Sequence, residues 1–177
     1  METRMRLKRI TAYLSIMAIS LNGFVLQPAE AEDVIILKIS GAIGSCETTN
    51  SAGECTVRFT FEDLRAIGTT VVATVTPYTD GEPVFEGVLL RDLLAHVEAE
   101  EAPLQMIALN DYRATIPAQD PNEHDVLLAM KRDGERMPVR DRGPIWVIYP
   151  SENDVAMNML RHDHKMVWQL SEIVVLK

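Results

Sequence analysis

The hydrophobic pattern of the chain consists mainly of short runs of β-branched, aromatic and other apolar residues that turn residues interrupt. Such runs are typical of β-strands, and the Gly, Asn and Asp positions between them are typical of turns. Turns at Asp80-Gly81, Asn110-Asp111 and Asp133-Gly134 fit this pattern, and the last two predict hairpins. The predicted strands are Val34–Ile39, Thr56–Phe59, Thr70–Thr76, Leu104–Leu109, Tyr112–Ile116, Val126–Lys131, Glu135–Val139, Ile145–Tyr149 and Trp168–Leu176.

Two segments have the pattern of an amphipathic helix. Thr60 and Asp63 have the spacing of a capping box, which predicts a short helix that buries Leu64 and Ile67 and ends at Gly68. The second predicted helix, Val88–Val97, has its leucines on one face. Strands outnumber helices, and few predicted strands are separated by a helix of crossover length, so we expect an α+β domain.

The first residues have the pattern of a secretory signal peptide. Basic residues precede the mostly apolar segment Ile10–Leu26, and Ala29-Glu30-Ala31 follows as a small-x-small cleavage pattern. We expect a signal peptide over residues 1–31, cleaved near Ala31, and one domain over residues 32–177. An uncleaved anchor is the alternative, although polar residues within the apolar segment weaken it. No second long apolar run follows, so we expect no membrane insertion after cleavage.

The charge of the chain argues against two classes of partner. The net charge is −9, and loss of the basic start would leave the remainder more acidic. The long-range field of such a protein repels nucleic acids and anionic membrane surfaces. The acidic residues are dispersed, so no acidic tail is indicated.

The chain contains two cysteines, Cys46 and Cys55, on either side of a short polar segment. In an exported protein, a disulfide that closes this loop is the expected use of the pair. A catalytic or metal-binding thiol is the alternative, but no basic residue just before Cys46 would lower the pKa of its thiol.

A charged loop leads into the predicted strand that carries Trp146. Arg140 and Arg142 flank Asp141, and a Gly-Pro pair then turns the chain. The loop supplies donors, an acceptor and a nearby aromatic face, which is what a flat polar heterocycle requires. A salt-bridged turn before a core strand is the simpler alternative.

Other polar and aromatic residues have ordinary structural explanations beside functional ones. Asn110 and Asp111 are typical of turns, and Tyr78 and Tyr112 are typical of half-buried packing, as Trp146 is of a core. Loops at the ends of strands nevertheless often bind ligands. Trp168 is expected to pack in the core. The segment His162-Asp163-His164 resembles a metal-binding pair but offers no third ligand, so we expect a solvated polar loop.

Taken together, several motifs in a fixed order resemble one family. The motifs are Thr76–Gly81, Phe85–Leu94, Ala108–Tyr112, Ile116-Pro117, Asp133-Gly134, Met137, Arg140–Pro150 and Trp168–Leu170. This set resembles small exported proteins with a sulfite-oxidase-type molybdopterin-binding fold, and it covers nearly all of the chain after residue 31. The resemblance implies a mixed-sheet α+β fold that is rich in strands and has a few short helices.

The chain differs from the enzymes of this family in the residue expected to bind the metal. Those enzymes hold molybdenum through a cysteine thiolate in a loop after a central strand. The comparable stretch Val72–Tyr78 contains threonines and no cysteine, and a hydroxyl replaces a soft thiolate poorly. We therefore expect no molybdenum here. The chain is similar in this respect to PruR-type periplasmic pterin-binding regulators, which bind reduced pterins and act on the periplasmic domain of an inner-membrane GGDEF/EAL-type enzyme of cyclic di-GMP metabolism.

Three hypotheses follow from this resemblance. The first is a periplasmic, non-enzymatic pterin sensor, and the second is a molybdopterin-dependent oxidoreductase with an atypical metal ligand. The third is a structural adaptor that has lost the pocket. For the sensor, a carboxylate would pair with the amide-amidine edge of the pterin, arginine would bind its carbonyl side, and aromatic rings would stack on it. The candidate residues are Asp111 or Asp141 for the edge, Arg140 or Arg142 for the carbonyl side, and Tyr78, Tyr112 or Trp146 for stacking, with Asn110 in the same loop.

Overall fold

The computed structural model describes residues 34–49, 53–150 and 160–177. Of the two units of the chain, Met1–Glu30 and Ala31–Lys177, the second contains all of these residues. The predicted signal peptide lies outside the described residues. In the described ranges, no helix is both long enough and apolar enough to span a bilayer.

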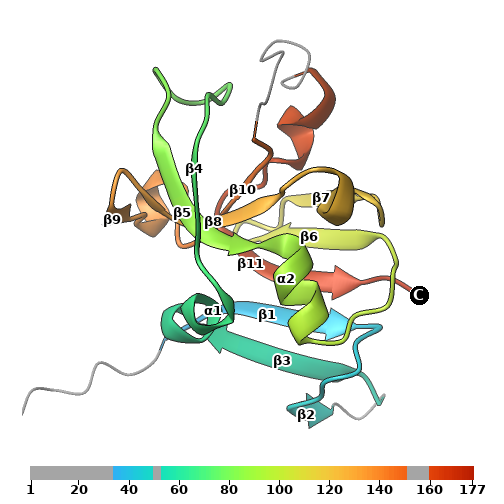
Figure 1. The fold of residues 1–177 in the computed structure, drawn as a ribbon. Coiled ribbons are helices and arrows are strands. Elements are labelled where there is room, and N and C mark those ends of the chain that lie inside the picture. The colour runs from blue at the N-terminus through green and yellow to red at the C-terminus, as the bar shows by residue number, and fades with distance from the viewer. Residues whose placement is uncertain (1–33, 50–52, 151–159) are drawn as a thin grey trace, which may run out of the picture. The chain divides into compact units, whose positions relative to one another are not determined.

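The described part of the chain is rich in strands and has only short helices (Figure 1). The strands are β1 Ile35–Gly41, β2 Thr48–Thr49, β3 Cys55–Thr60, β4 Thr70–Ala73, β5 Val84–Leu89, β6 Leu104–Ala108, β7 Arg113–Ile116, β8 Leu127–Arg132, β9 Glu135–Arg136, β10 Trp146–Ile148 and β11 Leu170–Val175. The helices are α1 Phe61–Ile67, α2 Leu90–His96 and α3 Asp120–Glu123, with the 3-10 turns η1 Val139–Asp141 and η2 Asp163–Lys165.

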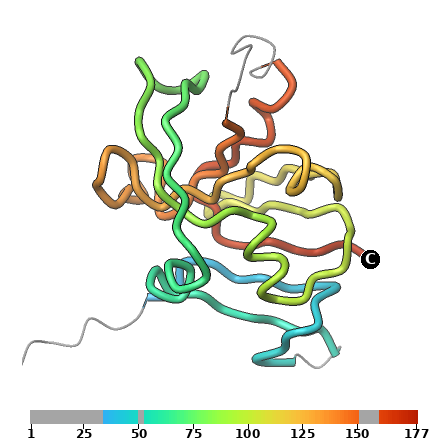
Figure 2. Tube along the Cα trace, viewed as in Figure 1, coloured from blue at the N-terminus to red at the C-terminus, as the bar shows by residue number. Residues whose placement is uncertain are grey.

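The strands form two sheets. The larger has the order β2-β3-β1-β11-β6-β7, and the smaller has the order β10-β8-β5-β4, with β9 paired to β8. β1 and β11 run parallel, whereas β11 and β6 run antiparallel, so the larger sheet is mixed. The parallel pair joins the two ends of the domain, and Figure 2 shows the blue strand β1 beside the red strand β11. These features confirm the predicted mixed-sheet α+β class.

The first predicted helix is confirmed, and the second begins later than predicted. In α1, the amide of Asp63 donates to Thr60 Oγ1 over 3.1 Å, and the Asp63 carboxylate accepts from the Thr60 amide over 2.8 Å. The predicted helix Val88–Val97 was wrong at its start, because Val88 and Leu89 continue β5 and pair with β8. A leucine-rich run on both faces suits a doubly buried strand as well as a helix, so the pattern could not separate the two.

Three predicted strands are shorter than expected, and two of the differences position the candidate site. β9 covers only Glu135–Arg136 of the predicted strand Glu135–Val139, because Pro138 has no amide to donate to a strand ladder and Val139 begins η1. β4 ends at Ala73, so the chain from Thr74 onward forms a loop. β11 begins at Leu170, and Trp168 precedes it. Gln169 has a left-handed backbone with φ 54°, which is incompatible with a continuous strand at that point. Trp168 is therefore freed from the sheet and is 37% exposed.

Hydrophobic side chains are buried on both faces of the smaller sheet. One cluster includes Leu128 and Val147 together with residues of the larger sheet and of α1 and α2. The other cluster includes Leu127, Trp146 and Ile148, with Tyr78 packed against it. Alternation along β8 and β10 sends successive side chains to opposite clusters. Trp146 is thereby placed in the core beneath Tyr78.

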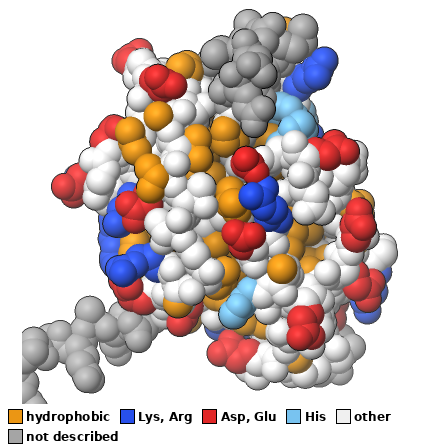
Figure 3. Space-filling view, viewed as in Figure 1, with side chains coloured by type: hydrophobic (Ala, Val, Ile, Leu, Met, Phe, Trp, Pro, Cys, Tyr) orange, Lys and Arg blue, Asp and Glu red, His pale blue; other side chains and the backbone are white. Residues whose placement is uncertain are grey.

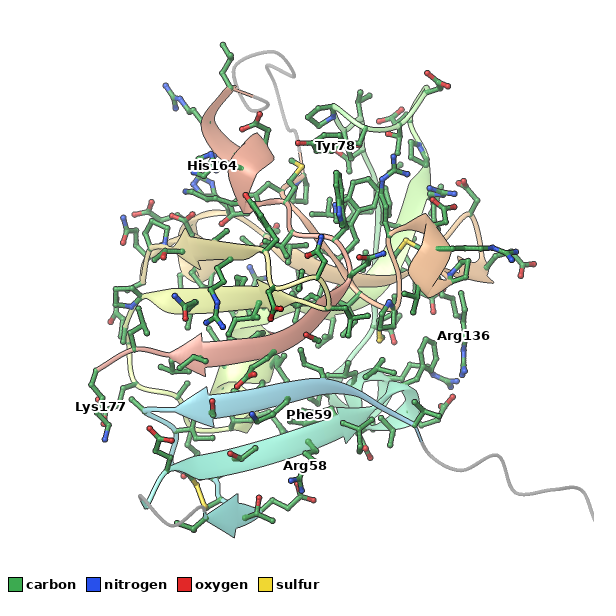
Figure 4. All side chains as sticks on the ribbon, turned by 180° about the vertical axis from the view of Figure 1, so that it is seen from behind. Arg58, Phe59, Tyr78, Arg136, His164 and Lys177 are labelled. Atoms are coloured by element: carbon green, nitrogen blue, oxygen red, sulfur yellow. A yellow bond between two sulfur atoms is a disulfide. The ribbon has the colours of Figure 1, made fainter. Side chains whose placement is uncertain are left out.

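Cys46 and Cys55 form the predicted disulfide. The bond closes the segment that contains β2 and leads into β3, with a Cα–Cα distance of 5.2 Å. Figure 4 shows the disulfide near one end of the domain and Tyr78 and His164 near the opposite end. The cysteines therefore stabilise a region remote from the loops considered below.

Charged side chains are dispersed over the surface of the described residues. Figure 3 shows acidic side chains scattered over the face seen in Figure 1, with basic side chains among them. Several carboxylates pair with cations, as in the ion pairs Lys131–Glu86 and Lys38–Glu172. This distribution agrees with the dispersed negative charge expected from the sequence.

Candidate functional site

Four loops meet where the two sheets approach the same end of the domain: those between β4 and β5, β6 and β7, η1 and β10, and η2 and β11. Backbone hydrogen bonds tie three of them together, from the Leu109 amide to the Gln169 carbonyl and from the Gln169 amide to the Arg142 carbonyl, each 2.9 Å long. The fourth loop is joined by a side chain, because Arg142 Nη2 donates to the carbonyl of Tyr78 over 2.9 Å. The loops thus form one connected frame.

A cavity of about 240 Å³ opens within this frame, and we call it the aromatic cavity. It is lined by Tyr78, Asn110, Tyr112, Asp163, His164, Met166, Val167 and Trp168. Its volume is below the roughly 300–1,000 Å³ of drug-sized ligand pockets, so it suits a ligand about as large as one fused-ring system.

The walls of the aromatic cavity are held by specific contacts. The rings of Tyr78 and Trp168 meet edge to face with centroids 5.1 Å apart. The Tyr112 hydroxyl donates to the His164 carbonyl over 3.0 Å, which ties the β6–β7 turn to η2. The side chain of Asn110 accepts from the Tyr112 amide over 3.1 Å, as in an Asx turn. Because these rings are fixed by packing and hydrogen bonds, little ordering entropy remains to be lost when a flat ligand binds.

The electrostatic character of the aromatic cavity is set by one carboxylate. Asp163 is the acidic residue of the lining, and among the described residues that line the cavity there is no lysine or arginine. Burial raises the pKa of Tyr78 above its usual value, and electrostatic interactions with Asp163 and then with Tyr112 raise it further. Tyr78 is therefore a neutral ring at physiological pH. A cavity of this kind suits a neutral or weakly basic heterocycle.

A second cavity, of about 290 Å³, also has Tyr78 in its lining, and we call it the polar cavity. Asp141 lies between two guanidinium groups there, accepting from Arg132 Nη2 over 2.6 Å and from Arg142 Nη1 over 3.3 Å. Arg142 has a left-handed backbone with φ 65°, and its guanidinium lies 4.9 Å from the ring centroid of Trp146. The polar cavity is lined by Tyr78, Thr79, Asp80, Pro83, Arg132, Asp133, Asp141 and Arg142.

Five of the eight candidate binding residues line one or both cavities, and three line neither. Asn110 and Tyr112 lie in the aromatic cavity, Asp141 and Arg142 lie in the polar cavity, and Tyr78 lies in both.

The three others occupy different environments. Arg140 is exposed on η1, and Asp111 is exposed at the tip of the β6–β7 turn with a φ of 65°. Trp146 is fully buried, and its indole N–H donates to the Met166 carbonyl over 3.2 Å. With no ring face open, Trp146 does not fit the stacking role expected of it. Its burial against Phe85 and Tyr78 instead supports the wall from below.

Sequence reasoning missed Asp163, His164 and Trp168 as lining residues. Trp168 was expected in the core of a strand, and a sequence pattern does not reveal the irregular backbone at Gln169 that exposes it. His164 is exposed, as expected for a solvated loop, but the same prediction was wrong for His162, which is 8% exposed. The feature of the sequence that pointed to Trp168 was the order of the motifs, since Trp168–Leu170 was among the stretches that carried the family resemblance.

A buried polar cluster holds η2 in place behind the aromatic cavity. The carboxylate of Asp120 accepts from the Tyr149 hydroxyl over 2.8 Å and from Lys165 Nζ over 2.7 Å. His162 stacks on Tyr149 with ring centroids 4.5 Å apart. Burial, followed by the hydrogen bond to Asp120, raises the pKa of Tyr149 well above its usual value. Burial, with the positive charge of Lys165 as the next cause, lowers the pKa of His162 to about 4.

The residues near the cavities do not fit a molybdenum ion held by a thiolate. Both cysteines of the sequence are paired in the disulfide. In the loop that follows β4, Thr74 and Thr76 are buried, and Thr76 Oγ1 accepts from the Tyr78 amide over 3.2 Å. Within the described ranges, no three His, Cys, Asp or Glu side chains form a group that could hold a metal ion.

One protein family matches the chain. The family is described as the oxidoreductase molybdopterin binding domain, and its sequence model matches residues 49–157, more than half of the chain. This span includes the β4–β5 loop, the β6–β7 turn and the η1 loop. Among curated proteins, no match to the chain was found.

Proposed function

Because this chain belongs to the oxidoreductase molybdopterin binding domain family, we propose that it binds a reduced pterin and acts as a sensor without catalysing a redox reaction. The family implies a pterin-type ligand. The observation that carries the proposal is the aromatic cavity beside a loop that offers threonine hydroxyls where a metal-binding thiolate would be needed. Such a site retains the aromatic walls and polar groups that a pterin ring can contact, and it lacks the thiolate ligand that molybdenum requires.

The proposed ring site uses Tyr78, Tyr112 and Trp168 as its apolar walls. Trp168 is partly exposed and its neighbours already hold it edge to face, so a flat ring can lie against it without rearrangement. Asp163 replaces Asp111 and Asp141 as our choice for the carboxylate that pairs with the amide-amidine edge, because it lines the aromatic cavity. Asn110 supplies a further polar group at the rim.

Titration with tetrahydropterin under argon, followed by tryptophan fluorescence and calorimetry, tests ring binding. Trp168→Ala removes a partly exposed indole ring that lines the aromatic cavity and is expected to weaken binding by about 2 kcal/mol, or roughly thirtyfold. Trp168→Phe retains a ring and is the matched control, with an expected loss of less than about fivefold. Unchanged affinity in a folded Trp168→Ala variant, checked by circular dichroism, would place the pterin elsewhere.

The absence of redox chemistry is proposed from the donor set and is tested separately. We expect no stoichiometric molybdenum in protein purified from its own periplasm, because both cysteines are committed to a disulfide. The second candidate function is an oxidoreductase with an atypical metal ligand, which the family description favours. Near-equimolar molybdenum by plasma mass spectrometry, together with sulfite or sulfoxide turnover, would support that candidate and contradict the sensor.

The proposed output is contact with an inner-membrane GGDEF/EAL-type enzyme through its periplasmic domain. Support comes from the predicted signal peptide, from a disulfide typical of extracytoplasmic proteins, and from the resemblance to PruR-type regulators. A ligand influences a partner only if the loaded and empty forms bind that partner differently. Calorimetry with the partner's periplasmic domain should therefore give different affinities with and without pterin, and equal affinities would reject pterin-controlled binding.

A further inference from the structure

The smaller sheet ends in a strand that is paired on one side only. β4 is the outermost strand in the order β10-β8-β5-β4, and Figure 1 shows it running from α1 to the β4–β5 loop. The Thr74 amide donates to the Pro83 carbonyl over 3.2 Å, so the backbone groups of Thr74 face β5. Because these groups alternate along an antiparallel strand, the N–H and C=O groups of Val71 and Ala73 point away from β5. Within the described ranges, no backbone hydrogen bond joins Val71 or Ala73 to a third segment.

The other edges of the two sheets are shorter, charged or covered. β2 and β9 have two residues each, and the exposed residues of β7 include Arg113. On β10, the Val147 amide donates to the Val167 carbonyl over 2.8 Å, so the segment before β11 occupies that edge. Charge, short length and cover are the features that keep a sheet edge from pairing with another chain. In contrast, Thr69–Thr76 contains no charged residue, and Val71 is 61% exposed.

We propose that β4 pairs antiparallel with β4 of a second copy of this chain, across a two-fold axis that passes beside Val72. In this register, Val71 of one copy lies opposite Ala73 of the other, and their outward N–H and C=O groups form about four hydrogen bonds. Val72 lies opposite its own counterpart. The edge is therefore self-complementary, as a two-fold interface requires. This inference goes beyond the proposed function and does not depend on it.

The charge distribution favours a second copy as the occupant of this edge. An uncharged strand has nothing that attracts a basic or an acidic segment, whereas two identical uncharged strands meet without a like-charge pair. The whole chain carries a net charge of −9, so two copies repel each other at long range. With so few hydrogen bonds, the dimer should be weak, with a Kd on the order of 10–100 μM. Salt should strengthen it by screening the repulsion.

Sedimentation equilibrium of the purified protein over about 1–500 μM measures this association. The mass should rise from that of a monomer toward that of a dimer, and the affinity should increase at least about twofold between about 50 and 300 mM NaCl. Val71→Lys places a charge on the exposed edge and should weaken the dimer at least about tenfold. Ile35→Lys is the matched control and should keep the affinity within about threefold. It makes the same change of charge at a 48% exposed residue of β1, which is paired on both sides.

A cysteine beside the axis tests the register. Residues that face each other in a non-hydrogen-bonded antiparallel pair have Cα atoms about 4.5 Å apart, within reach of a disulfide. Val72→Cys should therefore give a covalent dimer on mild oxidation by glutathione disulfide, seen on a non-reducing gel. In Ala73→Cys, the two cysteines are offset along the paired strands and should cross-link at least about tenfold more slowly.

Each result decides the proposal. A monomer at every concentration, or a dimer that a folded Val71→Lys variant does not weaken, overturns it, because the contact is then absent or lies elsewhere. Equal cross-linking of Val72→Cys and Ala73→Cys overturns the register and with it the two-fold pairing. If Val71→Lys does not fold, the comparison of the two cysteine variants decides. A complex with a different protein through this edge, with no dimer of this chain, also overturns the proposal.

Discussion

Replacement of Lys165 by methionine tests whether the buried polar cluster holds the wall of the aromatic cavity. Lys165 is the last residue of η2 and directly precedes Met166, Val167 and Trp168, which line the cavity. Its ammonium group bonds to the Asp120 carboxylate over 2.7 Å, and the two side chains are 12% and 5% exposed. Methionine retains much of the apolar stem of lysine and removes the charge.

The expected loss of stability follows from the burial of the carboxylate that remains. Breaking a buried ion pair by removing one partner typically costs about 3–5 kcal/mol, because it leaves an uncompensated charge. Here the Tyr149 hydroxyl still donates to Asp120, and Lys165 retains slight exposure, so we expect the lower end, about 3 kcal/mol. With a urea slope of about 2 kcal/mol/M, the midpoint of unfolding should fall by about 1.5 M.

Urea unfolding monitored by tryptophan fluorescence and by circular dichroism measures this change. The double variant Asp120→Asn/Lys165→Met is the decisive control, because a neutral amide removes the buried charge and can still accept from Tyr149. It should recover most of the lost free energy of unfolding. At low denaturant, where Lys165→Met remains folded, weaker pterin binding is also expected, since η2 carries part of the cavity wall.

The reasoning fails if Lys165→Met lowers the free energy of unfolding by less than about 1 kcal/mol, the size of an exposed ion pair. It also fails if the double variant is as unstable as the single variant, because the cost would then not arise from the stranded carboxylate. Normal pterin affinity in a destabilised but folded Lys165→Met variant would limit the cluster to stability alone.

Three further predictions concern other parts of the domain. Reduction of the Cys46–Cys55 disulfide should lower the free energy of unfolding by about 2–3 kcal/mol, which is the entropic contribution expected from closing a loop with a sequence separation of 9. Before reduction, intact mass after alkylation should show no free thiols. The pKa of His162 is lowered from 6.5 to about 4, so the unfolded chain binds more protons than the folded chain between these pH values. The free energy of unfolding should therefore be fully retained above pH 6.5 and should fall toward pH 4 by up to about 3 kcal/mol. In urea titrations at several pH values, His162→Phe should flatten this dependence on pH. Thr60→Ala should cost about 1 kcal/mol by thermal unfolding, whereas Thr60→Ser should cost little, and equal effects would reject the role of the capping hydroxyl.

The sequence alone determined the features that depend on local residue patterns and on the presence of two cysteines. The Thr60–Asp63 capping box, the turn at Asp133-Gly134 and most strand positions were correctly predicted, because backbone geometry and nearest-neighbour burial control them. The Cys46–Cys55 pairing followed from there being two cysteines on a short loop. The order of several motifs indicated the family, which the matched residues 49–157 confirm.

Only the tertiary structure decided which side chains meet. Val88 and Leu89 belong to a strand because β8 lies beside them, and no local pattern contains that pairing. Trp146 and Trp168 look alike in sequence, yet one is fully buried and the other lines the aromatic cavity, because the chain turns at Gln169 just before β11. The physical reason is that burial and ligand access depend on contacts between residues distant in sequence, whereas hydrophobic periodicity describes only neighbours along the chain.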